Sequence, residues 1–335
     1  MYFMMIVLII SFLNPIYLSA ENNIFTEVNR IELKLDQPYY RMADLKVLED
    51  GFVLILDEAA RSFRSYPTII KTDKDGNIVK KYNKRGYGPG ELRRTGKIAV
   101  DENSIWVSEQ NEPWIHEFTH SLEFKKDYKI KNRGNIVINN SKFIGIWSTA
   151  YRKDGVYMIQ LYDKKNLEFK KLAFKIEEKN IPHFVSTWGG ICEVDTNTYA
   201  GIYCTEFQIR IFDGDFELKN ILLKKTPKYV KKYFPWKKGE IFNTESREWM
   251  KNWTKMHSIF FIDNHFIVVY MYKEQLYLDV IDKYGNVKYS NYKMPENFGY
   301  YTSEGNYLWK AKRVEYQDKI KYYLIKEKSN LNLLK

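Results

Sequence analysis

The chain of 335 residues has little of the chemistry that marks the common enzyme classes. It contains two cysteines and five histidines. The histidines form no HExxH or similar pair, so the sequence does not support a zinc site. No Gly-x-Ser-x-Gly elbow occurs, and the cysteines have neither metal-ligand nor redox spacing. These absences exclude the motif-defined hydrolases and zinc enzymes and leave the function open.

Long apolar runs are missing too, except at the start of the chain. Residues 1–20 carry no charged side chain, and Leu18-Ser19-Ala20 offers small residues for cleavage. This pattern predicts a signal peptide over residues 1–20 with cleavage near Ala20, hence a secreted or periplasmic protein without a transmembrane span in the mature chain. Because Lys and Arg are absent from the start, an uncleaved anchor is the alternative, although the stretch is short for a span.

The two cysteines fall on the two strands of one expected hairpin. Counting from a turn at residues 195–198 places Cys192 opposite about Gly201 and Cys204 opposite about Gly189. A direct disulfide would need a shifted register, although export permits one. Two buried free thiols are the alternative.

The formal net charge of the chain is +11, and residues 1–20 contribute none of it. An exported basic protein can meet acidic glycans, anionic lipid surfaces or nucleic acid. The alternative is codon bias in an AT-rich genome, since Lys, Asn, Ile and Tyr are all abundant and the lysines are spread along most strands. Nucleic acid is not an expected partner for an exported chain.

What the sequence does contain is a repeated turn. Short turns, most with Gly, Asn or Ser, separate β-rich runs, and their anchors are residues 76, 121, 166, 214, 285 and 329. The intervals are 44 to 48 residues long, with one exception of 71. A period in the forties built of strands is typical of propeller blades, and the 27 Tyr, 20 Phe and 8 Trp suit strands. Six anchors predict an all-β, six-bladed β-propeller.

Four strands per blade place residues 24–335 in one propeller domain, which we expect to be monomeric. The last blade lacks a full fourth strand, while residues 25–33 alternate in hydropathy and belong to no other blade. We predict that this N-terminal strand pairs onto the last blade and closes the ring, because closure removes two unpaired sheet edges.

The interval of 71 residues holds an insertion at about residues 226–256, between blades four and five. Thr226-Pro227 is a helix-start signal, and apolar residues follow at helical spacing, so a short helical insertion is expected. It is rich in lysine and carries Trp236. An insertion in a regular repeat often carries function. The alternative is a flap that covers a blade face and leaves its lysines solvated.

One segment carries a recognisable motif. Residues 85–92 read Arg-Gly-Tyr-Gly-Pro-Gly-Glu-Leu and link blade one to blade two. The segment resembles the Gly-x-Gly-Pro-Gly-Glu-Phe/Leu linker of bacterial six-bladed propellers related to NHL-repeat proteins. The resemblance implies a polar central channel and one ligand-binding face, in a group that consists mostly of non-catalytic exported binding scaffolds and uncharacterised proteins. The segment is not a phosphate loop, because it lacks the Lys-Ser/Thr pair and a following helix.

In a propeller, the blade-to-blade linkers and the loops between second and third strands gather on one face. Exposed aromatic side chains beside arginines suit a sugar or peptide ligand. Besides Tyr87 of the linker, the candidate ligand-binding residues there are Arg61, Arg64, Tyr66, Arg93, Arg94, Trp114, Tyr151, Arg152 and Trp236. The alternative for each is that it seals a gap between blades. We expect an exported, non-catalytic scaffold without a cofactor that binds a glycan or protein partner at the cell envelope.

The enzymatic alternative is a calcium-dependent lactonase or phosphotriesterase with its metal in the central channel. Such six-bladed enzymes surround calcium with Glu, Asn and Asp oxygens. The candidate ligands, all just after a second strand, are Glu58, Glu109, Asn111 and Glu206. Their spacing is not diagnostic.

Overall fold

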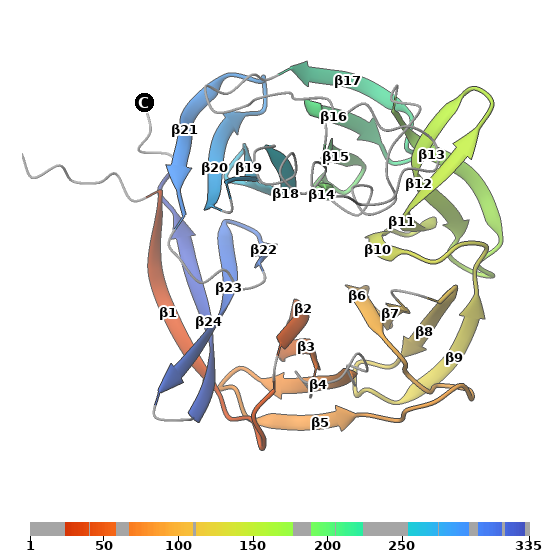
Figure 1. Cartoon of the computed structure of the whole chain (residues 1–335), viewed down its shortest axis with the longest axis vertical. Helices are drawn as coiled ribbons and strands as arrows, with labels where there is room; N and C mark the ends of the chain where they lie inside the picture. The colour runs from red at the N-terminus through yellow and green to blue at the C-terminus, as the bar shows by residue number, and fades with distance from the viewer. Residues whose placement is uncertain are drawn as a thin grey trace, which may run out of the picture.

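The six predicted blades are present. The computed structural model describes residues 24–39, 41–57, 67–109, 112–176, 189–204, 206–223, 254–273, 275–294, 301–316 and 319–331. Within these ranges the chain forms strands β1 to β24 and no α-helix. The strands make six four-stranded antiparallel sheets arranged around a central axis (Figure 1). The prediction of an all-β, six-bladed propeller is therefore confirmed.

Five blades consist of four consecutive strands that run from the axis to the rim. In chain order their strands are β2 (Arg41–Leu48), β3 (Gly51–Asp57), β4 (Pro67–Asp73) and β5 (Ile78–Tyr82); β6 (Thr95–Val100), β7 (Ile105–Glu109), β8 (Trp114–Phe118) and β9 (Phe124–Lys129); β10 (Asn135–Asn139), β11 (Phe143–Arg152), β12 (Gly155–Asp163) and β13 (Phe169–Ile176); β14 (Gly189–Asp195), β15 (Thr198–Tyr203), β16 (Glu206–Asp213) and β17 (Leu218–Leu223); and β18 (Lys255–Ile262), β19 (His265–Tyr272), β20 (Gln275–Asp282) and β21 (Val287–Lys293).

The sixth blade combines the two ends of the described chain. It contains β22 (Tyr301–Glu304), β23 (Tyr307–Tyr316) and β24 (Lys319–Ser329), with β1 (Phe25–Leu33) outermost. β1 runs antiparallel to β24 from the pair Phe25–Ser329 to the pair Leu33–Tyr322. Just before the first pair, the Asn330 amide donates to the Ile24 carbonyl at 2.9 Å. Residues 25–33 thus occupy the position in the last blade that their alternation predicts.

The core of the described molecule lies between the blades. Its buried apolar side chains fall into six clusters, each shared by two neighbouring blades. The second and third strands supply most of them; all seven residues of β3 are buried, for example. Burial on both faces explains why these strands read as continuous apolar runs rather than alternating ones.

The repeated turn lies between the third and fourth strands of a blade. At its anchor the backbone has a positive φ, and the N–H donates to a carbonyl three or four residues earlier. The anchors are Gly76, Leu122, Leu167, Phe216 and Gly285. Two of the sequence-derived anchors match, and those at 121, 166 and 214 lie one or two residues too early. The anchor at 329 is wrong as a turn, because Ser329 ends β24 and the neighbouring strand comes from the other chain end.

Two predicted segments lie largely outside the described residues. They are the signal peptide at residues 1–20 and the helical insertion, of which residues 224–253 are not described. The predicted end of the insertion at residue 256 is wrong, because β18 begins at Lys255. In the part of the chain that is described, no helix has the length and apolar character to cross a membrane.

Neither cysteine forms a disulfide. In the β14–β15 hairpin Cys192 lies opposite Ala200, and Gly189 lies opposite Tyr203, which is one residue from the predicted register. Cys204 follows β15 and is buried. Burial raises the pKa of the Cys192 thiol, so the free-thiol alternative fits two structural cysteines.

Candidate functional site

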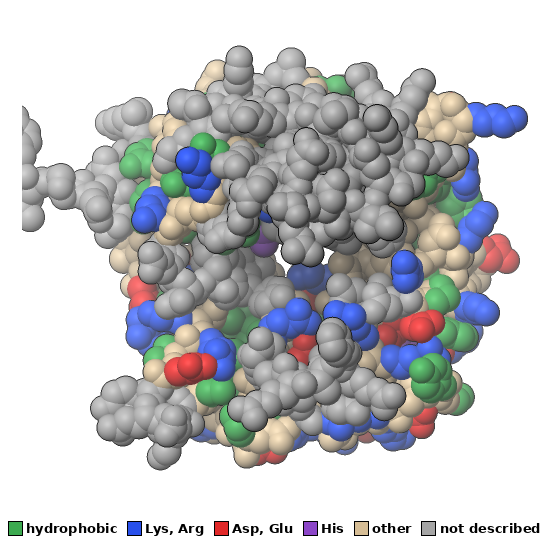
Figure 2. All heavy atoms as spheres, in the orientation of Figure 1, with side chains coloured by type: hydrophobic (Ala, Val, Ile, Leu, Met, Phe, Trp, Pro, Cys, Tyr) green, Lys and Arg blue, Asp and Glu red, His purple; other side chains and the backbone are tan. Residues whose placement is uncertain are grey.

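The predicted ligand-binding face can now be located. Strands alternate in direction within each blade, so the blade-to-blade linkers and the loops between second and third strands meet at one face of the ring. We call it the linker face. The turns between third and fourth strands lie at the opposite face. In the view of Figure 2, along the ring axis, Lys and Arg side chains border the central opening.

The linker at residues 85–92 is held by side chains of the two blades that it joins. The Tyr82 hydroxyl donates to the Gly90 carbonyl at 2.7 Å, and the Gly90 amide donates to Asp127 Oδ2 at 2.7 Å. Within the segment, the Gly88 amide donates to Glu91 Oε2 at 2.7 Å. The glutamate of the motif is therefore a backbone acceptor that closes the loop.

Two of the three linker glycines occupy backbone conformations that favour glycine. Gly86 has φ 144° and Gly90 has φ 72°. A Cβ atom at Gly86 would lie 2.0 Å from Glu91 Oε2, and one at Gly90 would lie 2.7 Å from the Tyr82 hydroxyl. The expected tight path is present at these two positions, whereas Gly88 has no positive φ.

A buried chain of carboxylates and imidazole lies beneath the linker. Glu109 Oε1 and Oε2 accept the backbone N–H groups of Arg93 and Arg94 at 3.0 and 2.7 Å. His116 Nε2 lies 3.3 Å from Glu109 Oε1, and its Nδ1 lies 2.6 Å from Asp127 Oδ1. One histidine therefore joins the carboxylate that holds Gly90 to the carboxylate that holds the two residues just after the linker.

This arrangement shifts the protonation of two groups. Burial of Glu109 would raise its pKa, but bonds from His116 and from the Arg93 and Arg94 amides hold the pKa below its usual value. Burial of His116 would lower its pKa, but Glu109 and Asp127 together raise it above that of a free histidine. His116 therefore keeps its proton to higher pH than a free histidine. The contacts favour the charged forms of both Glu109 and His116.

An exposed aromatic and cationic cluster sits above this network. The Tyr87 side chain is 82% exposed, and the Arg93 guanidinium lies 3.3 Å from its ring centroid. Arg93 Nη1 pairs with Glu112 Oε1 at 2.9 Å, which joins the linker to the loop of blade two. Trp114 opens the next strand, with Lys129 Nζ 5.8 Å from its ring centroid. We define the linker patch as Tyr87, Arg93, Arg94, Glu112, Trp114 and Lys129.

The structure brings some predicted ligand-binding residues together and separates others. Arg93, Arg94 and Trp114 belong to the linker patch. Tyr151 and Arg152 lie on another blade, at the end of β11, where Tyr151 is 52% exposed. The predicted residues outside the described part of the chain are Arg61, Arg64, Tyr66 and Trp236.

The candidate calcium ligands in the described chain have protein partners. Both Glu109 oxygens accept backbone N–H groups, and Glu206 Oε2 lies 2.5 Å from Arg210 Nη2 in a buried pair. Glu109 is in blade two and Glu206 in blade four. Glu58 and Asn111 lie outside the described residues. Among the described residues, no group of three or more His, Cys, Asp or Glu side chains could hold a metal ion.

Polar groups also lie on the inner strands. Lys97 Nζ pairs with Asp44 Oδ1 at 3.1 Å, and the Ile98 amide donates to Asp44 Oδ2 at 2.7 Å, so this carboxylate joins β2 to β6. The His257 side chain of β18 is partly open to solvent, but many protein atoms surround its ring. This enclosure, with a contribution from the Lys97 charge, lowers its pKa to about 4, so His257 is neutral at physiological pH.

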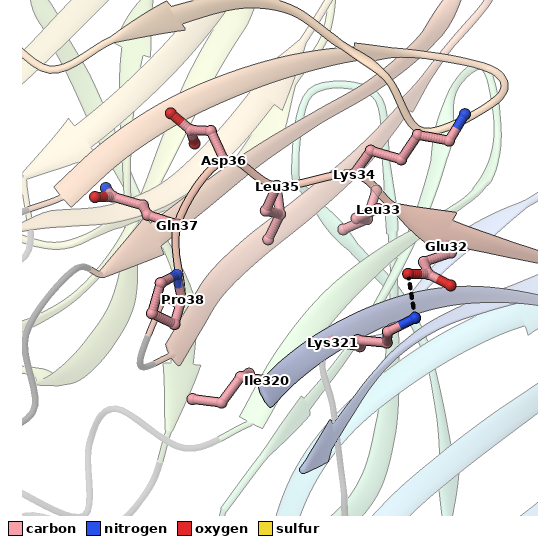
Figure 3. Close-up of a pocket in the computed structure, with 9 residues that line it drawn as sticks. All are labelled: Glu32, Leu33, Lys34, Leu35, Asp36, Gln37, Pro38, Ile320 and Lys321. Atoms are coloured by element: carbon pink, nitrogen blue, oxygen red, sulfur yellow. Dashed lines mark ion pairs between the residues drawn. The ribbon is translucent and has the colours of Figure 1, made fainter. Parts of the chain in front are cut away.

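A separate open pocket of about 360 Å³ lies in the sixth blade, where β1 ends and β24 begins. Figure 3 shows its two walls, one from the end of β1 and the segment after it, the other from the start of β24. The Glu32–Lys321 ion pair, 2.8 Å long, crosses between them. None of the predicted site residues lines this pocket.

Comparison with known proteins gives a likeness in structure alone. No protein-family model and no curated protein matches the chain. A candidate exported protein of Bacteroides fragilis is 12% identical with a TM-score of 0.65, covering 92% of this chain and 96% of that one. A member of the DUF4221 family from Bacteroides vulgatus is 11% identical with a TM-score of 0.60, covering 91% and 98%. The likeness is one of fold.

An enzyme shares this fold as well. The virginiamycin B lyase of Staphylococcus aureus, in its selenomethionine form, is 11% identical with a TM-score of 0.54, covering 90% of this chain and 99% of that one. The propeller fold therefore hosts exported proteins and a lyase alike, and function has to be argued from the site.

Sequence reasoning missed the residues that position the linker patch. These are His116 and Asp127, and two members of the patch itself, Glu112 and Lys129, were missed as well. One signal was available, because His116 and Asp127 are directly opposite on β8 and β9, and opposite charges at such positions attract. Their connection to Glu109 and to the linker depends on contacts distant in sequence.

Proposed function

We propose that this protein is an exported, non-catalytic binding propeller that recognises a glycan or protein partner at the cell envelope through its linker face. The observation that carries the proposal is the Tyr87–Arg93 stack. Tyr87 is largely exposed, yet the guanidinium on one side of its ring fixes its orientation. A fixed aromatic ring loses little conformational entropy when a ligand stacks on its open side.

The ionisable groups beneath the patch support binding rather than catalysis. Glu109 and His116 are almost fully buried; Glu109 holds the Arg93 and Arg94 backbone, and His116 holds Glu109 and Asp127, so both are engaged in positioning. Arg93 is likewise fixed by Glu112 and Tyr87. A preorganised polar and aromatic surface of this kind is suited to orienting a ligand.

Export is supported by two observations of different kinds. The candidate exported protein of Bacteroides fragilis has the same fold over 92% of this chain. The sequence of residues 1–20 has the apolar run and small-residue end of a signal peptide. Determining the N-terminal residue of the protein recovered from its host's envelope fraction tests this part, and an intact Met1 would contradict cleavage near Ala20.

Binding is tested by replacing aromatic residues on the two opposite faces of the ring. The variants are Tyr87→Ala and Trp114→Ala, with Tyr284→Ala as control, since Tyr284 is 73% exposed on a turn at the other face. On a glycan and envelope-protein array we expect each linker-face variant to lose about tenfold in affinity, which corresponds to one aromatic contact of about 1.4 kcal/mol. Equal binding by all three variants would contradict the proposed face.

The calcium hydrolase alternative has its own test. Because Glu109 and Glu206 already have protein partners, we expect the melting temperature to be the same with excess calcium and with chelator. A large rise with calcium would instead indicate a metal site. The search would then turn to Glu58, Glu109, Asn111 and Glu206 with lactone and phosphotriester substrates.

A further inference from the structure

The acidic residues of the linker region point their oxygens inward. Glu91, Glu109 and Asp127 together accept the backbone N–H groups of Gly88, Gly90, Arg93 and Arg94. The His116 ring lies between Glu109 and Asp127, with one nitrogen facing each carboxylate. These three carboxylates are therefore engaged by groups of the protein itself.

The cationic residues of the same region point outward. Exposed cations on the linker, next to it or beside Trp114 are Lys84, Arg85, Arg94 and Lys129. Glu112, the acidic member of the linker patch, is paired with Arg93. The surface around Tyr87 and Trp114 thus carries an excess of positive charge, which attracts anions and weakens with added salt.

We propose that the linker patch selects anionic polysaccharides, with uronate-containing chains as the ligand class. This inference rests on the proposed function and specifies its ligand. Tyr87 and Trp114 offer aromatic faces on which the C–H face of a pyranose ring can stack. Arg94 and Lys129 stand beside them to bind carboxylate groups. A sugar acid combines a flat apolar face and a negative charge in one unit, which is the combination that the patch presents.

The test uses the full mature protein with three defined polymers. The probes are polygalacturonate, which is carboxylated, heparin, which is also sulfated, and neutral dextran. Affinities are measured by titration calorimetry at 50 and 300 mM NaCl. We expect binding to polygalacturonate that weakens at the higher salt and no binding to dextran. Heparin binding shows whether the patch also accepts sulfated chains, and heparin binding without polygalacturonate binding would overturn the uronate assignment.

A pair of matched double variants separates the site from the net charge. Arg94→Ser with Lys129→Ser removes two cations from the linker patch, and Lys219→Ser with Lys288→Ser removes two from the outer strands β17 and β21. Both lower the net charge equally. We expect at least a tenfold loss of polygalacturonate affinity in the first and little change in the second.

Each other result has a distinct meaning. Equal loss in both double variants would show long-range attraction by the whole chain and would overturn the site. Binding to dextran that depends on Tyr87 would overturn the anionic selectivity while leaving the proposed binding function in place. Failure to bind any polysaccharide, with array binding to an acidic protein, would overturn the inference and favour a protein partner.

Discussion

At the scale of single residues, the repeated turns balance backbone strain against burial. Five equivalent anchors have positive φ, which costs non-glycine residues about 1–2 kcal/mol. Glycine avoids this cost in blades one and five, whereas Phe216 and two leucines accept it in the other blades. Their side chains are almost fully buried between blades, and Phe216 stacks on Tyr199 at 4.6 Å. Burial therefore outweighs strain at these positions.

Replacing Phe216 tests that balance. Loss of a buried Phe side chain costs about 3–5 kcal/mol, and relief of the left-handed backbone returns about 1–2, so we expect Phe216→Gly to lose about 2 kcal/mol of unfolding free energy. Urea denaturation measures the change. The control is Asn264→Gly, at an exposed turn position with φ 61°, which should change stability by less than about 0.5 kcal/mol. A Phe216→Gly variant as stable as wild type would show that relief of backbone strain fully offsets the lost burial.

A second residue-level prediction concerns Asp101. Burial opposes its ionisation, but the Lys164 ion pair and bonds from the Asn103 amide and the Trp106 indole lower its pKa to about 2. A depressed carboxyl pKa contributes stability above the unfolded-state pKa of 3.8, and this is lost as pH falls towards 2. In urea denaturation at pH 4.5, 3.5 and 2.5, we expect Asp101→Asn to lose less stability than wild type. If the unfolding free energies of the two proteins changed in parallel with pH, Asp101 would not contribute to the acid sensitivity.

At the scale of elements, the linker is an irregular segment fixed by regular ones. The strands of blades one and two supply four side chains that reach the linker backbone directly or through another of them, namely Tyr82, Glu109, His116 and Asp127. Contacts from rigid strands allow a loop to present side chains in one arrangement. The position of Arg93 over Tyr87 therefore depends on groups that lie largely beneath the surface.

His116→Gln tests this dependence. The raised pKa of His116 means that its contribution is complete below about pH 6.5 and is lost as pH rises through the folded-state value. We expect wild-type unfolding free energy to decline with pH above neutrality and the variant to lack that slope. Trypsin cleavage after Arg85 or Arg93 should be faster in the variant, and the control is cleavage at the exposed Lys283, on a turn of blade five. Equal cleavage at the linker in both proteins would contradict the positioning role.

Strand patterns and turn chemistry were readable from the sequence because they are local. Asp73 shows why, since its carboxylate accepts the Asp75 and Asn77 amides within one turn, and Asp282 repeats this at Tyr284 and Asn286. Leu122, Leu167 and Phe216 were harder to place, because a bulky residue with positive φ is justified only by packing against the preceding blade. The boundaries of β18 and β22 depend similarly on tertiary pairing.

At the scale of the whole molecule, one blade holds the ring together without a covalent turn. β1 packs Leu33 against the core shared by blades six and one and pairs with β24 along its length. We expect a chain that starts at Asp36 to lose cooperative thermal unfolding, because β24 and the adjoining core become exposed. A chain that starts at Ile24 is the control. If calorimetry gives both the same sharp transition, the strand is dispensable for closure.

The site was only partly predictable for a reason that also lies at this scale. Arg93, Arg94 and Trp114 could be placed on the linker face because the propeller period fixes which loops share a face. The sequence did not show that Glu109 would hold the linker backbone rather than a metal, because its partners Arg93 and Arg94 are 16 and 15 residues away and on another segment. Which partners a carboxylate meets is decided by the fold, and spacing alone does not reveal it.

The meeting of the two chain ends also determines how the protein can be oriented. The pair Phe25–Ser329 and the bond from Asn330 to Ile24 lie at the face opposite the linker patch. A tether attached ahead of Ile24 would therefore hold the ring at the face opposite the linker face, with Tyr87 directed away from the support. Joining residue 331 to residue 24 by a short peptide and opening another turn at that opposite face should likewise give a permuted ring. Immobilised or permuted in this way, the protein would keep the linker face directed away from the support.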